Sequence, residues 1–229
     1  MFGIKKATPR KRGRPKGSKT KKTSTTKAPV RIYKGNKAPS VYKTEKKAVD
    51  KNKLKVNDII YNLTKENRHV NKCALILESP AMLTTKALKK AGFTERQIEI
   101  PNFDKKDYQG IKRKHKNTYN VSVGEFLDMV ENFGRESFDI AFLDYMCTLT
   151  GNKACSPKED ITKYYKYRFP KHNSILAITL SYRSKNGDVI DLISYVQNEA
   201  RKFGMNATLL QESFSYPGMF VTFFNVQKI

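Results

Sequence analysis

The chain is poor in cysteine, in histidine and in long apolar runs, and each shortage excludes a class of protein. Three cysteines, Cys73, Cys147 and Cys155, cannot form an even disulfide framework, so we expect an intracellular, reducing compartment. The histidines do not combine with them at zinc-site spacing, so no metal site is predicted. The longest apolar runs, such as residues 74–77, are too short to cross a bilayer, and residues 1–6 contain no apolar signal region. We therefore expect no membrane attachment.

Acidic residues are scarce too, and their scarcity is local. The chain has 45 Lys and Arg against 21 Asp and Glu, a formal charge of +24. Residues 1–70 hold 22 basic and 4 acidic residues, whereas residues 71–229 hold 23 and 17. The first part therefore predicts an arm that binds a polyanion through counterion release, with steep salt dependence. On charge alone, that polyanion could be DNA, RNA or acidic lipid.

Regular hydrophobic spacing is absent from residues 1–48, which are rich in Lys, Thr, Ser and Pro. Such a segment cannot bury enough apolar surface to fold by itself, so we expect a disordered basic arm. The pattern changes near Asp50, where apolar residues begin to recur at helical spacing. We therefore divide the chain into an arm, residues 1–48, and one folded domain, residues 49–229.

The arm contains Arg12-Gly13-Arg14-Pro15, a tetrapeptide narrow enough to lie along the floor of a DNA minor groove. It resembles the AT-hook motif, in which flanking basic residues support the Arg-Gly-Arg-Pro core. The resemblance implies binding to A·T-rich DNA through Arg10, Lys11, Arg12, Gly13, Arg14, Pro15 and Lys16. The alternative is a generic polybasic tail or a nuclear-import signal.

After the arm, expected strands alternate with expected helices. The expected helices are residues 50–67, 83–91, 124–132, 161–169 and 189–203. The expected strands are residues 73–77, 97–100, 118–123, 138–143, 174–180, 208–214 and 219–227. This alternation predicts a three-layer, Rossmann-like α/β domain with a mostly parallel seven-stranded sheet. The last two strands flank a turn at residues 215–218 and predict a C-terminal antiparallel hairpin.

The order of these elements, closing on an antiparallel strand, resembles class I S-adenosylmethionine-dependent methyltransferases over about residues 50–229. The resemblance implies that the cofactor is S-adenosylmethionine. That family ends its first strand in an acidic residue followed by a glycine-rich turn. Glu78 matches the acidic position, but Ser79, Pro80, Ala81 and Met82 replace the glycines. The cofactor loop is therefore divergent.

Ligands of open parallel sheets bind at the carboxyl ends of the strands, which selects the polar residues found there. With the resemblance, the implied cofactor contacts are Glu78, Ser79, Pro80, Thr84, Thr85, Asn102, Asp104 and Ser122. The alternative for the first loop is a Ser- and Thr-rich turn that caps a helix. For Asn102 and Asp104, the alternative is ordinary turn chemistry.

A strongly apolar strand ends in Asp144-Tyr145, followed by a polar loop. In the family, the loop after this strand faces the transferred methyl group, so the resemblance implies catalytic roles for Asp144 and Tyr145. Amino-methylating DNA enzymes have two prolines after the first residue of this loop, and this chain has none. The alternative is that both residues cap the strand and brace the loop.

Two functions follow, from different classes. The first is an S-adenosylmethionine-dependent methyltransferase acting on nucleic acid, held on DNA by its arm, with RNA as a further possible substrate. The second is a catalytically inactive methyltransferase-fold protein that binds or packages DNA. Either suits a nucleus or a viral DNA compartment, and the sequence leaves the oligomeric state open.

Overall fold

The computed structural model describes residues 51–66, 71–102, 105–115, 118–123, 133–152, 155–182 and 185–229. The basic arm and its Arg-Gly-Arg-Pro core lie outside these residues. The helices are α1 Lys51–Thr64, α2 Leu83–Lys90, the short 3-10 helix η2 Glu95–Gln97, α3 Lys105–His115, α4 Pro157–Lys166 and α5 Lys185–Lys202. The strands are β1 Ala74–Ile76, β2 Ile98–Asn102, β3 Asn120–Val123, β4 Phe138–Asp144, β5 Pro170–Ser181, β6 Met205–Leu209, β7 Phe214–Tyr216 and β8 Met219–Lys228.

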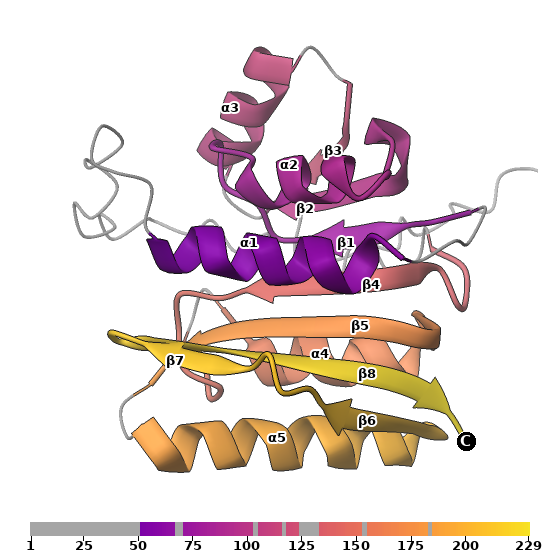
Figure 1. The fold of residues 1–229 in the computed structure, drawn as a ribbon, viewed down its shortest axis with the longest axis vertical. Coiled ribbons are helices and arrows are strands. Elements are labelled where there is room, and N and C mark those ends of the chain that lie inside the picture. Colours follow the sequence, from indigo (N-terminus) through magenta and orange to yellow (C-terminus); the bar gives the residue numbers. More distant parts are fainter. Residues whose placement is uncertain are drawn as a thin grey trace, which may run out of the picture. The chain divides into compact units, whose positions relative to one another are not determined.

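One sheet runs through this domain in the order β3-β2-β1-β4-β5-β8-β6, and β7 pairs with β8 outside that path (Figure 1). Strands β1 to β5 are paired in parallel. Strand β8 is antiparallel to β5, β6 and β7. The predicted α/β class, the mostly parallel sheet and the C-terminal antiparallel hairpin are therefore confirmed.

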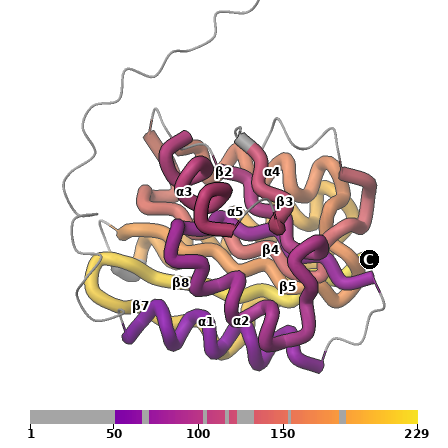
Figure 2. Tube along the Cα trace, turned by 90° about the horizontal axis from the view of Figure 1, so that it is seen from above, coloured from indigo at the N-terminus to yellow at the C-terminus, as the bar shows by residue number. Residues whose placement is uncertain are grey.

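Helices cover both faces of the sheet, with α1 and α2 on one side and α4 and α5 on the other (Figure 2). Alternate residues of each strand pack on opposite faces of the sheet, because successive side chains of a strand point in opposite directions. Ile140 and Phe142 of β4 pack in the core under α1, α2 and α3, whereas Ala141 and Leu143 pack in the core under α4 and α5. Two apolar layers therefore hold the strand ends in place.

The expected strand at residues 208–214 is wrong in its bounds. The chain forms β6 earlier and β7 later, and the segment between them turns, with the Ser213 amide donating to the Leu210 carbonyl at 3.3 Å. Polar Gln211 and Glu212 occupy this turn and are exposed. The sheet therefore has eight strands in the described part of the chain, where seven were expected.

Helix α3 was not predicted. It buries only Ile111 and is otherwise dominated by basic side chains, so it lacks the apolar periodicity that marks an amphipathic helix. The expected helix at residues 124–132 lies outside the described residues. Within the described ranges, no helix is long and apolar enough to span a membrane.

Candidate functional site

Glu78 follows β1 and ties the end of that strand to the start of α2. Its Oε2 accepts hydrogen bonds from the Thr85 amide at 2.8 Å and from the Thr85 hydroxyl at 3.1 Å. Its Oε1 accepts from the Ser79 amide at 3.1 Å. The acidic residue predicted at this strand end therefore organises the loop that follows it.

The loop of residues 79–82 makes a glycine-type turn without glycine. Met82 is buried and has φ 54° and ψ 40°, in the left-handed region that side chains other than glycine rarely adopt. Helix α2 begins there with no capping side chain. Pro80 lies against Gly110 of α3, and Lys114 Nζ donates to the Pro80 carbonyl at 3.4 Å. The turn is thus held in shape by its neighbours, not by its own composition.

The ends of the next strands lie along the same edge of the sheet. Asn102, at the end of β2, is buried and donates from Nδ2 to the Glu78 carbonyl at 3.2 Å. Ser122 of β3 is half-buried and lies in register with Pro101 of β2. The structure therefore brings Glu78, Asn102 and Ser122 to one edge, as predicted. Asp104 falls outside the described residues.

Asp144 and Glu78 line one small cavity of about 30 Å³ at this edge. Its walls are Lys53, Val56, Asn57, Glu78, Ser79, Leu83, Thr84, Phe142, Asp144, Thr179 and Tyr216. Thr179 is buried, and its hydroxyl lies beside the Asp144 carboxyl group, where its hydrogen bond opposes the rise that burial causes in the pKa of Asp144. The cavity is large enough for a water molecule, and its polar walls favour a small polar group there.

The cavity-lining residues that come from α1 and β7 were not predicted from the sequence. Lys53 and Asn57 are four residues apart, which places them on one face of α1. That polar pair on an amphipathic helix was the available signal. Tyr216 is the last residue of β7, more than 130 residues from Glu78 in the chain, and no local pattern pointed to it.

The pKa values of the Glu78 and Asp144 carboxyl groups are both raised. Burial raises the pKa of Glu78 to about 7, the hydrogen bonds from Thr85 and Ser79 oppose the rise, and the charge of Asp144 adds to it. Burial also raises the pKa of Asp144, and the positive charge of Lys53 opposes that rise. Glu78 can therefore hold or release a proton near neutral pH, which general acid–base chemistry requires.

Tyr145 does not share this cavity. As the residue after Asp144 it points to the other side of the sheet, where it is buried and its hydroxyl donates to Asp160 Oδ2 of α4 at 2.7 Å. Burial, followed by the charge of Asp160, raises the pKa of Tyr145 well above its usual range. Here Tyr145 braces the loop after β4 against α4, the alternative that the sequence had left open.

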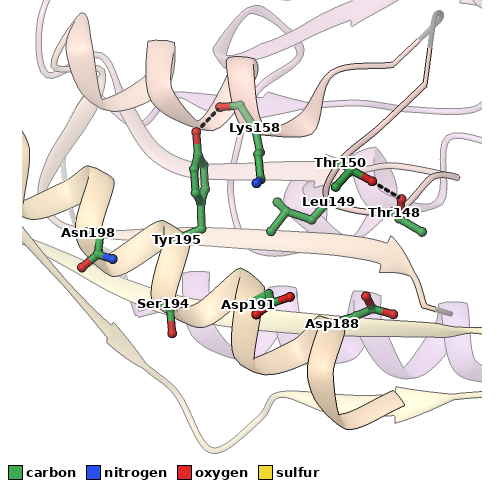
Figure 3. Close-up of a pocket in the computed structure, with 9 residues that line it drawn as sticks. All are labelled: Thr148, Leu149, Thr150, Lys158, Asp188, Asp191, Ser194, Tyr195 and Asn198. Carbon is green, nitrogen blue, oxygen red and sulfur yellow. Dashed lines mark hydrogen bonds between the residues drawn. The ribbon is translucent and has the colours of Figure 1, made fainter. Parts of the chain in front are cut away.

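A larger hollow of about 550 Å³ lies on the α4 and α5 side of the molecule (Figure 3). It is lined by Thr148, Leu149, Thr150, Lys158, Asp188, Asp191, Ser194, Tyr195 and Asn198. The Tyr195 hydroxyl donates to the Lys158 carbonyl at 3.1 Å, and the Thr148 and Thr150 hydroxyls are 3.0 Å apart. None of the residues predicted for cofactor or catalysis lines it.

The sequence matches no protein-family model and no curated protein. Solved structures do match. M. jannaschii TYW2 in complex with AdoMet is 13% identical, covering 80% of this chain and 80% of that chain, with a TM-score of 0.54. Trm1 from Pyrococcus horikoshii with S-adenosyl-L-methionine is 12% identical, covering 77% of this chain and 56% of that chain, with a TM-score of 0.54. The methyltransferase domain of bacterial CtHen1-C is 11% identical, covering 77% of this chain and 98% of that chain, with a TM-score of 0.55.

The chain shares its Rossmann-like α/β fold with these solved methyltransferase structures. At these identities the likeness concerns the fold, and the chain spans less than two thirds of the length of some matched structures, Trm1 among them. Within this fold, the cavity beside Glu78 and Asp144 lies at the carboxyl ends of β1 and β4, where open parallel sheets bind their ligands.

Proposed function

We propose that this protein is an S-adenosylmethionine-dependent methyltransferase that acts on nucleic acid, with DNA as the substrate. The observation that carries the proposal is the cavity in which Asp144, the buried Thr179 hydroxyl and Glu78 meet at the carboxyl edge of the sheet. The methyltransferase fold and the AdoMet-containing structures that share it support the choice of cofactor. The basic arm with its Arg-Gly-Arg-Pro core supports the choice of nucleic acid.

The residues around α2 fit the cofactor. Met82 gives α2 no side-chain cap and Glu78 takes the Thr85 amide, so the amides of the first turn that would meet a cofactor carboxylate are those of Leu83 and Thr84. The left-handed turn at Met82 keeps a glycine-type backbone course although no glycine is present. Asn102 and Ser122 stand at the next two strand ends, where they would hold polar groups of the nucleoside. When bound, S-adenosylmethionine supplies an activated methyl group.

The residues around β4 handle the acceptor. The raised pKa of Asp144 makes its carboxylate a better base for a proton leaving an acceptor amine. The Thr179 hydroxyl beside it can bond the same acceptor, and Lys53 stabilises the ionised form of Asp144. An acceptor base in duplex DNA must be flipped out of the stack to reach this edge. Positioning of the two reactants then supplies much of the rate.

The direct test is calorimetric titration of the full chain with S-adenosylmethionine, combined with methyl transfer to DNA from labelled cofactor. We expect heat of binding and a raised melting temperature for the wild type. Thr179→Val keeps the shape of the side chain, so it should bind the cofactor normally. Asp144→Asn should also bind, but lose transfer by roughly 10²-fold or more, the usual contribution of a general base.

The matched control is Glu212→Gln, which removes an exposed carboxylate that does not line the cavity. It should leave binding and transfer unchanged. Absence of both heat and thermal protection at millimolar cofactor would overturn the methyltransferase proposal.

A second candidate is a DNA-binding protein that has kept the fold and lost catalysis. The absence of glycine from residues 79–82 favours it, since a side chain there can obstruct close approach of a cofactor. It predicts sequence-tolerant coating of DNA that survives Glu78→Ala and Asp144→Ala, with no heat on cofactor titration. Methyl transfer to DNA by the wild type would exclude it.

A further inference from the structure

The positive charge of the folded domain is concentrated on two neighbouring helices. Residues 83–115 hold nine Lys and Arg against four Asp and Glu, which accounts for most of the basic surplus of residues 71–229. Helices α4 and α5, on the other face, hold six basic and five acidic residues together. The net charge of residues 71–229 is therefore small, but their positive charge is gathered on one side of the sheet.

The basic side chains of α2 and α3 form one surface, which we call the α2–α3 face. Its members are Lys86, Lys89, Lys90, Lys105, Lys106, Lys112, Arg113 and Lys114. In Figure 1, α3 and α2 lie side by side toward the β3 end of the sheet, and the Lys114 contact with the Pro80 carbonyl joins α3 to the loop before α2.

Positive charges of lysines from both helices act on His115, the last residue of α3. Burial, followed by the positive charges of Lys114, Lys86 and Lys89, lowers the pKa of His115. Lys89 is paired with Glu95, whereas Lys86 and Lys114 are exposed and have no ion pair among the described residues. Clustered like charges destabilise the compact state through self-repulsion, and a bound polyanion relieves that repulsion.

The surroundings of the face distinguish a phosphate backbone from a lipid surface. The exposed large apolar side chains of the described ranges are Leu54, Met146, Tyr167, Ile190, Leu209 and Ile229. None belongs to α2 or α3, whereas a helix that binds a membrane surface inserts an apolar face between the lipids. The face therefore has the charge for acidic lipid and lacks the apolar contacts.

We propose that the α2–α3 face binds the phosphate backbone of duplex DNA as a second contact, in addition to the arm. The choice of duplex DNA rests on the proposed function and on the Arg-Gly-Arg-Pro core carried by the same chain. Two contacts in one chain raise the effective concentration of each for the same duplex. The hollow with Asp188 and Asp191 lies on the opposite side and would repel phosphate there.

The test compares two triple variants of the full chain that remove the same charge from opposite faces. Lys86→Gln, Lys105→Gln and Arg113→Gln change exposed residues of the α2–α3 face, and Lys166→Gln, Arg168→Gln and Arg201→Gln change exposed residues elsewhere. Binding to a duplex of about 20 base pairs is followed by fluorescence anisotropy between about 50 and 200 mM salt. Thermal unfolding of both variants checks that they fold.

Each lost phosphate contact lowers the slope of log K against log salt by about 1. The face variant should therefore lose up to about three units of slope and at least tenfold in affinity, while the control variant keeps a slope close to that of the wild type. Equal losses in the two variants would overturn the proposal. The proposal would also be overturned if the face variant lost affinity for single-stranded RNA and bound duplex DNA as tightly as the wild type.

Two further measurements keep the result independent of folding and of catalysis. In wild-type protein, DNA should shift the imidazole NMR signals of His115 and leave those of His172, on β5, in place. An unchanged His115 would overturn the proposal without any variant. The face variant should bind S-adenosylmethionine like the wild type, so failure of cofactor binding speaks against the methyltransferase proposal alone.

Discussion

Glu78 shows how one side chain can serve both the fold and the chemistry. Its carboxylate accepts three hydrogen bonds from Ser79 and Thr85 and joins β1 to α2. The same burial that makes those bonds possible raises its pKa to about 7. A residue that organises the loop is therefore also protonated at mildly acidic pH.

This has a consequence for stability. The folded state holds a proton on Glu78 that the unfolded chain, with an ordinary pKa of 4.5, has already released. The free energy of unfolding should therefore fall as the pH rises from about 4.5 to 7, by up to about 3 kcal/mol, since each pKa unit is worth about 1.4 kcal/mol.

Glu78→Gln removes this titration, so we expect its melting temperature to depend less on pH between 5 and 8 than that of the wild type. Asp144, whose pKa is also raised, stays in both proteins and accounts for pH dependence that remains in the variant. The exposed change Glu212→Gln should behave like the wild type. Identical pH profiles for Glu78→Gln and the wild type would contradict the expectation.

The loop between β4 and α4 is the element that holds Asp144 in place on one side and shapes the larger hollow on the other. Asn152 and Cys155 exchange backbone hydrogen bonds of 2.8 and 3.2 Å, which close the loop on itself. The Cys147 carbonyl accepts from the Ser181 amide at 3.0 Å and fastens the loop to the end of β5.

Gly151 is the position where this loop tolerates no side chain. Its φ is +72°, and a Cβ there would lie 2.2 Å from the Cys155 carbonyl oxygen. We expect Gly151→Ala to destabilise the protein by more than about 2 kcal/mol, because backbone must move as well as adopt a strained φ.

Gly218 provides the matched control, because its φ of +77° is similar and nothing lies within 4 Å of a Cβ built there. Gly218→Ala should cost only the conformational strain, about 1 kcal/mol. Chemical denaturation of the two variants measures the difference. Equal losses would show that the contact with Cys155 carries no cost.

At the scale of the whole molecule, charge is divided twice: between the arm and the domain, and between the two faces of the domain. Net charge by itself promotes attraction to any polyanion, and it does not select a sequence. We propose that the Arg-Gly-Arg-Pro core, which lies outside the described residues, makes the arm select A·T-rich DNA.

Arg12→Ala combined with Arg14→Ala should reduce the preference for A·T-rich over G·C-rich duplex by at least about fivefold, because the two guanidiniums would no longer occupy the narrow groove. Lys21→Ala combined with Lys22→Ala removes the same charge outside the core and should weaken binding to both duplexes alike. Competition between the two duplexes measures the preference. A similar change of preference in both variants would mean that charge alone acts.

The fold was largely readable from local patterns, and the exceptions have physical causes. Short apolar runs ending in polar residues marked β1 and β4, since each run is buried whatever its neighbours are. Helix α3 was missed because its stability comes from one buried residue, Ile111, and from packing at the sheet edge. The strand expected at residues 208–214 was misplaced because β6 and β7 take their bounds from pairing with β8.

The chain's local order of apolar and polar residues determined which strand ends carry Glu78, Asn102 and Asp144, because those ends follow from burial of each run separately. Only the tertiary structure decided that Lys53 and Tyr216 close the cavity around them, that Tyr145 turns to Asp160, and that lysines of α2 and α3 meet. These are contacts between segments far apart in the chain. Their partners are chosen by the packing of helices on a twisted sheet, which no short stretch of sequence contains.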